Sequence, residues 1–227
     1  MDNRTYSIDT FGGNAAVVQN KVLRNTYALL ALSMLPTILG AFVGVQMGFK
    51  LSGIMGFVIF MAVAFGFMFA IERFKNSSIG VGLLLGFTFF MGLMLSRLIG
   101  AVLGYSNGAS LIGLAAGGTA LSFFGLAAVA STTKRDLSGM GKFLTIGSLL
   151  LLAAIVANIF LNVPALTLTI LVVLLGLSCA WLVYDINRVV TGGETNYVSA
   201  TLAIYLDVYN IFQSLLSLLG IFGGERD

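Results

Sequence analysis

The amino-acid sequence contains no histidine, and it has one cysteine and two prolines among 227 residues. Without histidine the chain cannot build imidazole metal sites, Ser-His or Cys-His catalytic pairs, or an imidazole pH sensor. The single cysteine, Cys179, excludes an intrachain disulfide and lies in an apolar run, where it is expected to pack as a small side chain. Pro164 suits the first turn of a helix, whereas Pro36 lies inside an apolar run and is expected to kink it.

Charge is also scarce, because Asp, Glu, Lys and Arg make up 9% of the chain whereas hydrophobic residues make up 58%. Soluble domains average about 25% charged residues, which they need to cover a surface in water. This chain cannot cover such a surface, so its apolar excess is expected to face lipid. The net charge of +3 falls at the ends of the apolar runs, where it sets membrane topology, and nucleic-acid binding is not expected.

Seven long apolar runs account for most of the chain. A spanning helix needs about 20 apolar residues, and lipid requires every backbone polar group to be bonded internally, which favours helices. The sequence therefore predicts an all-α membrane protein, a bundle of seven transmembrane helices. The runs cover residues 25–48, 52–72, 78–99, 109–131, 143–161, 165–188 and 198–222. The expected division is a flexible cytoplasmic N-terminal tail (1–24), the transmembrane domain (25–222) and a short C-terminal tail (223–227).

Orientation follows from lysine and arginine, which favour the cytoplasmic side of short membrane loops. Seven spans place nine of these residues on one side and three on the other. The nine are Arg4, Lys21, Arg24, Arg73, Lys75, Lys134, Arg135, Lys142 and Arg188, and the three are Lys50, Arg97 and Arg226. The bias predicts a cytoplasmic N-terminus and a periplasmic C-terminus.

Glycines recur at the four-residue spacing that lets membrane helices approach closely. The first run carries a double GxxxG at Gly40, Gly44 and Gly48, and the same spacing recurs in later runs at 82/86, 100/104 and 113/117. These faces serve either packing within one bundle, which we favour, or association between copies. The oligomeric state stays open.

Two aspartates lie within apolar runs, the sixth and the seventh, at positions expected to be inside the membrane. An ionisable group at membrane depth is costly, so each is a candidate functional residue. Asp185 and Asp207 are 22 residues apart, and the midpoint of this interval is residue 196, inside the connection between the runs. An antiparallel hairpin folding back there brings both carboxyl groups to similar depth in the cytoplasmic half of the bundle.

A polar seam accompanies this pair. Asn210, Ser214 and Ser217 follow Asp207 at helical spacing and share its face, and Ser178 shares a face with Asp185. Such a seam forms either a hydrated path or a hydrogen-bonded contact between helices. The two aspartates favour the functional interpretation.

Two adjacent carboxylates resist ionising together, so the pair is expected to share a proton. In that state the two groups hold the helices together. When both ionise, they repel each other and can coordinate a hard cation such as Ca²⁺ transiently. Alternatively, Arg188, about one turn from Asp185, neutralises it as a simple ion pair. Beside these groups, Glu72, next to Arg73 and Lys75, is expected to form a local ion pair at the membrane surface.

At these residues the sequence resembles the Bax inhibitor-1 family of seven-helix membrane proteins, and it is most similar to the bacterial YccA branch. The carboxylates in YDINR and YLDVYNIFQSLL agree with that family's sixth- and seventh-helix motifs. Further matching segments are KVLRNTYALL (21–30), GGTAL (117–121), TTKRDLS (132–138), ANIFLNVPAL (157–166), GGETNY (192–197) and VYNIF (208–212). The resemblance covers nearly the whole chain from residue 20.

The resemblance implies two activities in the bacterial inner membrane. The YccA branch is associated with FtsH, a membrane-anchored ATP-dependent protease, which its members modulate as slowly degraded substrates. Channel-like members instead conduct Ca²⁺ as a pH-sensitive leak, with Asp185 and Asp207 in the sensor positions by similarity. An arginine of the second helix participates in some members, but the loose match around Arg73 does not carry that role over. No cofactor is implied, apart from Ca²⁺ as a permeant ion.

Two other classes of membrane protein fit less well. Aspartyl intramembrane proteases also carry two aspartates on their sixth and seventh helices, and Tyr184-Asp185 agrees with them. Their second aspartate lies in a GxGD motif, whereas Asp207 follows AIYL, and the PAL at 164–166 precedes both aspartates instead of following them. We therefore do not expect an enzyme. A secondary transporter would show two repeated halves, and no clear repeat is visible.

The charge bias leads to a prediction about topology. Reporter fusions placed after residue 140 should report a cytoplasmic location, and fusions at the C-terminus should report an external one. A cytoplasmic C-terminus would require an even number of spans and would contradict the seven-span map.

Overall fold

The computed structural model describes residues 9–49, 53–133, 135 and 137–225. Within them the chain forms seven helices and no strands, which confirms the predicted fold class. The helices are α1 (Asp9–Gln46), α2 (Gly53–Phe74), α3 (Ser78–Leu103), α4 (Gly108–Thr132), α5 (Ser138–Leu161), α6 (Pro164–Val190) and α7 (Tyr197–Gly223). Each contains a stretch long and apolar enough to cross a membrane.

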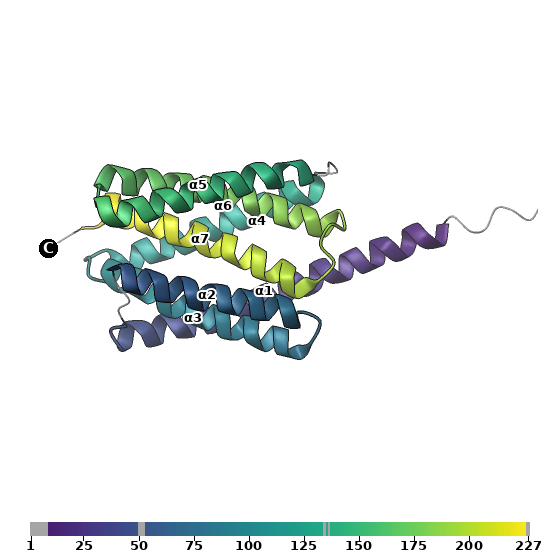
Figure 1. Cartoon of the computed structure of the whole chain (residues 1–227), viewed down its shortest axis with the longest axis horizontal. Coiled ribbons are helices and arrows are strands. Elements are labelled where there is room, and N and C mark those ends of the chain that lie inside the picture. The colour runs from purple at the N-terminus through teal and green to yellow at the C-terminus, as the bar shows by residue number, and fades with distance from the viewer. Residues whose placement is uncertain (1–8, 50–52, 134, 136, 226–227) are drawn as a thin grey trace, which may run out of the picture.

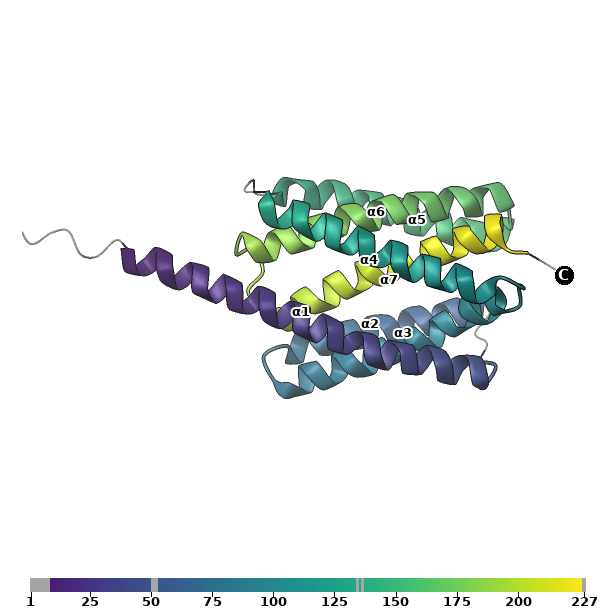
Figure 2. The same ribbon diagram turned by 180° about the vertical axis from the view of Figure 1, so that it is seen from behind.

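The helices run up and down through the bundle, so the two ends of the described chain lie at opposite ends of the molecule (Figures 1 and 2). The basic residues follow the predicted division. Lys21, Arg24, Arg73, Lys75, Arg135, Lys142 and Arg188 lie toward one end, and Arg97 lies toward the other. Arg4, Lys50, Lys134 and Arg226 lie outside the described residues. Which end faces the cytoplasm stays a prediction.

Helix α1 begins earlier than the sequence predicts. We expected a flexible tail through residue 24, but α1 starts at Asp9, and its membrane-spanning part starts at Gln19. Once a helix is nucleated, each further residue adds one backbone hydrogen bond, and no proline interrupts the chain before Pro36. The first turns of α1 project beyond the other helices (Figures 1 and 2). Residues 1–8 lie outside the described part.

The other end of the chain is tied to the connection between α3 and α4. The Asn107 side chain donates to the carbonyl of Gly223 at 2.6 Å and accepts from the backbone N–H of Glu225 at 3.2 Å. The carbonyl of Glu225 in turn accepts from the backbone N–H of Ser106 at 3.1 Å. Residues 223–225 of the expected C-terminal tail are therefore held against the bundle.

Helix α7 is the central helix, and it packs against α1, α2, α3, α4 and α6 (Figure 1). Two tyrosines one turn apart attach it to α3. Tyr205 donates to the carbonyl of Thr88 and Tyr209 to that of Met91, at 3.4 and 3.2 Å, and the Tyr205 hydroxyl also bonds Thr37 of α1 at 2.9 Å. This face of α7 is covered by α1 and α3, and the rest of the helix packs mainly against α4 and α6.

Glycines bring α1 and α3 into close contact. A Cβ at Gly40 would meet the backbone of Phe89, one at Gly44 would meet Ser96, and one at Gly92 would meet the backbone of Thr37. The first GxxxG therefore packs within the chain, as we favoured. Around Gly82, Gly100, Gly113 and Gly117, by contrast, a Cβ would find open space, so these glycines do not create a close approach between helices of the chain.

A matched pair of glycine variants tests this crossing. Gly92→Ala should lower the unfolding temperature in detergent, because its Cβ would press on the Thr37 carbonyl and lie 2.9 Å from the backbone nitrogen of Ala41. Overpacking of this kind typically costs about 1–3 kcal/mol. Gly117→Ala meets no atom within 4 Å and should leave the unfolding temperature unchanged or raise it, since alanine favours helix by about 1 kcal/mol. Equal effects at the two positions would contradict the close crossing.

Candidate functional site

The turn between α6 and α7 sets the position of the predicted aspartates. Gly192 adopts a positive φ of 81° that suits glycine, and the N–H of Glu194 returns to the carbonyl of Arg188 at 3.0 Å. Asn196 then caps α7, because its side chain accepts from the N–H groups of Val198 and Ser199 at 2.9 and 3.2 Å. The chain thus turns back near residue 196, as the spacing predicted.

This turn brings the carboxyl groups of Asp185 and Asp207 within hydrogen-bonding reach of each other. Both side chains are buried, with exposed fractions of 8% and 6%. A hydrogen bond between two carboxyl groups requires a proton on one of them, so proton sharing by this pair stays a prediction that the short approach of the two groups makes possible. The Oδ2 atom of Asp207 has no hydrogen-bond partner among the described residues.

Arg188 forms the ion pair with Asp185 that the sequence offers as the alternative. Its guanidinium lies 3.8 Å from Asp185 and 3.6 Å from Glu194, and 5.7 Å from the ring centre of Tyr184. Both ion-pair distances exceed the 2.7–2.9 Å of a strong charge-assisted hydrogen bond. Arg188 therefore stabilises a negative charge on Asp185 without forming a strong hydrogen bond to it. This ion pair and the contact between the two aspartates are present together.

A cavity of about 980 Å³ lies beside the pair. Its walls come from α2 on one side and from α5 and α6 on the other, and α7 forms much of its floor. The polar side chains in the lining gather toward the end that carries the turn. They include Glu72, Asp185, Arg188, Glu194, Ser199 and Asp207. The paired carboxyl groups thus border an open space rather than a closed helix contact.

The predicted polar seam is only partly in this space. Ser178 and Asn210 line the cavity with the aspartates, but Ser214 and Ser217 do not. Ser214 is fully buried and its hydroxyl has no partner among the described residues. Gln213 lines the cavity instead. It follows Asn210 at a spacing of three, a helical signal that the serines obscured.

Glu72 also joins the cavity, although its sequence context suggested a membrane-surface anchor. The expected ion pair is present, with the Lys75 ammonium 2.7 Å from the Glu72 carboxylate. This hydrogen bond raises the pKa of Lys75, which lies beyond the end of α2. Arg73 is exposed at the end of α2 and is not part of the cavity lining.

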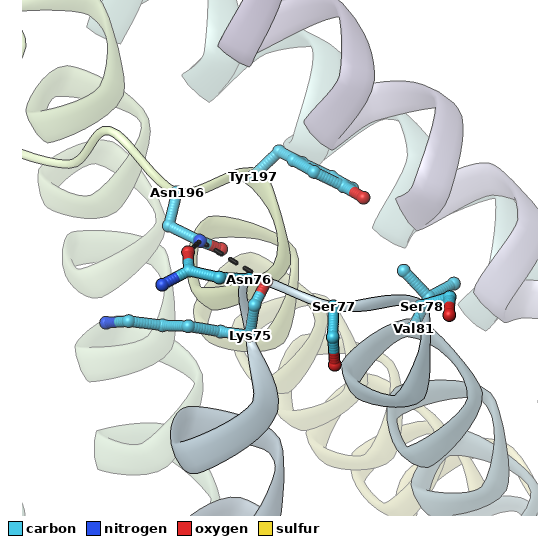
Figure 3. A pocket seen from close by; sticks show the side chains of 7 residues that line it. All are labelled: Lys75, Asn76, Ser77, Ser78, Val81, Asn196 and Tyr197. Atoms are coloured by element: carbon cyan, nitrogen blue, oxygen red, sulfur yellow. Dashed lines mark hydrogen bonds between the residues drawn. The ribbon is translucent and has the colours of Figure 1, made fainter.

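A second, smaller hollow of about 480 Å³ lies at the same end of the bundle, where the α2–α3 connection meets the start of α7 (Figure 3). Asn196 ties the two connections together, since its amide donates to the Asn76 side chain at 2.7 Å and to the Lys75 carbonyl at 3.3 Å. These bonds give the hollow a structural role: they hold the turn that positions Asp207.

The residues that the structure describes contain no cluster of three or more metal-ligating side chains. Ca²⁺ takes six to eight oxygen ligands, and Asp185 and Asp207 supply carboxylate oxygens from two residues. The pair therefore offers part of a coordination shell, which suits a passing ion better than a resident one.

The chain is similar to a known protein family and to several bacterial proteins. Residues 19–224 match the family model described as "Inhibitor of apoptosis-promoting Bax1". The chain is 37% identical over 201 residues to the protein of Escherichia coli (strain K12) named "Modulator of FtsH protease YccA", covering 88% of this chain and 90% of the relative. An uncharacterised protein of Neisseria meningitidis is also 37% identical, over 92% of this chain and 94% of its own length. A protein of Pseudomonas aeruginosa matches at 37% over 93% and 96%.

Proposed function

The chain belongs to the Bax inhibitor-1 family, and on that premise we propose that it modulates the membrane-anchored protease FtsH by binding it as a slowly degraded substrate. It is a multi-pass protein of the bacterial inner membrane, as its seven apolar helices and the relatives named inner membrane protein YccA indicate. The observation that carries the proposal is the 37% identity, over 88% of the chain, to a relative named as a modulator of FtsH. The role is binding, not catalysis.

The shape of the molecule supports this role. A processive protease must engage an accessible segment, and chain ends are the usual place. The first turns of α1 project beyond the bundle, at the end that carries most of the basic residues (Figure 2). Extraction from that end must then disrupt the close crossing of α1 with α3. An accessible handle on a tightly packed first helix is what a slowly degraded substrate requires.

Removal of the projecting segment tests the proposal. Deleting residues 1–17 stops short of the span that begins at Gln19, so the bundle should still form. We expect a several-fold longer half-life after translation is stopped, measured by immunoblotting in cells with FtsH. In cells depleted of FtsH, the full and shortened chains should be equally stable.

Replacing residues 1–17 by a Gly/Ser segment of equal length provides the control, and it should restore turnover if accessibility is what matters. A detergent pull-down of the tagged full chain should also retain FtsH. Unchanged lifetime on deletion would exclude this segment as the entry point, and absence of FtsH from the pull-down would refute the proposal itself.

The aspartate pair supports a second function, a pH-sensitive Ca²⁺ leak. Asp185 and Asp207 contact each other at the edge of the large cavity, where ions could reach them. While one proton is shared, the carboxyl groups hold α6 and α7 together. As the pH rises and that proton is lost, two negative charges are left in contact, and they repel each other while attracting cations. Flux should therefore increase with pH over the range in which the pair loses its proton.

Substitution of one aspartate tests the leak. Asp207→Asn keeps a side chain that can donate to Asp185 but removes the shared proton, so the pH dependence of Ca²⁺ flux into liposomes should flatten. Asp185→Asn should have an effect of the same kind. Glu225→Gln, beyond the far end of α7 from the pair, is the matched control and should leave the profile unchanged. If the unmodified protein shows no flux at any pH, the leak is refuted and the pair is structural.

A further inference from the structure

The residues that line the large cavity extend along α2, α6 and α7, so we describe the cavity as a groove parallel to these helices. Met61, Phe65 and Met68 line it from α2, and Leu174, Leu177 and Trp181 line it from α6. These positions step along each helix by three or four residues, so each set forms a stripe parallel to its helix axis. The walls are therefore two apolar stripes that face each other across α7.

The groove is long enough for one leaflet of a bilayer. Glu72 and Phe57 mark its two ends on α2 and are 15 residues apart, which corresponds to about 22 Å at the rise of an α-helix. Half of the hydrocarbon core of a bilayer measures about 15 Å. The polar end of the groove lies near the ends of α2 and α6, which is the depth of lipid headgroups.

The polar end carries groups of both signs that the chain leaves poorly paired. Arg188 has five N–H donors, yet its two carboxylate contacts are 3.6 and 3.8 Å long. The Asp207 Oδ2 atom lines the groove, is buried, and has no hydrogen-bond partner among the described residues. Unpaired polar atoms inside a membrane protein are costly, and the loosely paired Arg188 guanidinium has donors left for a ligand.

We propose that this groove binds one aminophospholipid, a lipid with an ammonium and a phosphate in its headgroup, such as phosphatidylethanolamine. The phosphate would bond Arg188, whose planar guanidinium suits phosphate oxygens. The ammonium would bond the carboxylates of Glu72 and Glu194, and one acyl chain would lie between the stripes of α2 and α6. The lipid site shares its polar end with the aspartate pair of the leak proposal, but neither the leak nor the protease proposal requires a bound lipid.

The charges at the polar end of the groove favour a zwitterionic lipid headgroup over an anionic one. Four carboxyl groups and one guanidinium line the polar end, and one further ammonium, Lys75, pairs with Glu72 from outside the lining. With one proton shared by the aspartates, the groups at this end carry three negative and two positive charges. An anionic headgroup without an amine would meet this excess of carboxylate, whereas a zwitterion offers a partner to both signs. A water-soluble cation would leave the apolar stripes uncovered.

Photocrosslinking of the full chain in nanodiscs tests the proposal. Phosphatidylethanolamine and phosphatidylglycerol, each with the same diazirine-bearing acyl chain, would be compared at equal content. We expect crosslinked peptides from α2 and α6, with labelling by phosphatidylethanolamine stronger by roughly tenfold, the ratio that one charge-assisted hydrogen bond produces. Unlabelled phosphatidylethanolamine should compete, a measurement that needs no variant.

Variants then separate headgroup recognition from simple filling of the groove. Arg188→Gln should reduce the preference between the two lipids while leaving acyl-chain labelling in place. Ala203→Phe, on the floor of the groove, should abolish labelling of α2 and α6. Ala116→Phe, on the exposed side of α4, is its matched control and should not. Gel filtration after heating would verify that each variant is folded.

Three outcomes would overturn the proposal. Equal labelling by the two lipids would show that the headgroup is not recognised. Labelling spread evenly over the outward faces of all seven helices would show that the groove is not a site. A photoreactive amino acid at Leu177 should give a lipid-sized adduct in cells, and a protein-sized adduct instead would identify the groove as a docking site for another membrane helix.

Discussion

The absence of water inside the bilayer is the constraint on which the structure depends, because every polar group there must find its partner within the chain or in a ligand. In α1, short polar side chains satisfy this requirement by hydrogen bonding within their own helix. Thr26, Ser33 and Thr37 each bond the carbonyl one turn back, at 2.8–2.9 Å. Helix α7 cannot do the same for Asp207, whose carboxyl group is held by Asp185 instead. The turn at residues 191–196 is therefore as important as the pair, since it brings the two carboxyl groups together.

The two faces of α7 have different functions as a result. One face is closed by tyrosine hydroxyls that bond the backbone of α3, and the glycine crossing of α1 and α3 holds that half of the bundle tightly. The other face borders the groove and carries Asp207 and Asn210. A rigid half and an open half thus share one central helix. The protonation or the ligand contacts of the residues that border the groove can change without disturbing the packing of α1 and α3.

Much of this organisation could be predicted from sequence, because hydropathy and helical spacing are local properties. Seven apolar runs predicted seven helices, and the symmetric placement of Asp185 and Asp207 about residue 196 predicted their contact. The groove could not be predicted in this way. Its existence depends on how α2 and α6 are placed on either side of α7, which is a property of helix packing. The places of Glu72 and Gln213 in the cavity lining depend on the same packing and could not be predicted either. The helical start of α1 at Asp9 was missed because polar composition alone suggested a tail.

Arg188 connects the open face to the aspartate pair. It contacts Asp185 through one guanidinium nitrogen and Glu194 through the other, so any group that recruits the guanidinium withdraws positive charge from Asp185. A phosphate bound there would make the second negative charge of the aspartate pair harder to sustain and would favour the shared proton. By linkage, loss of that proton must weaken the phosphate to the same extent. Lipid occupancy and the protonation of the pair are therefore one coupled equilibrium.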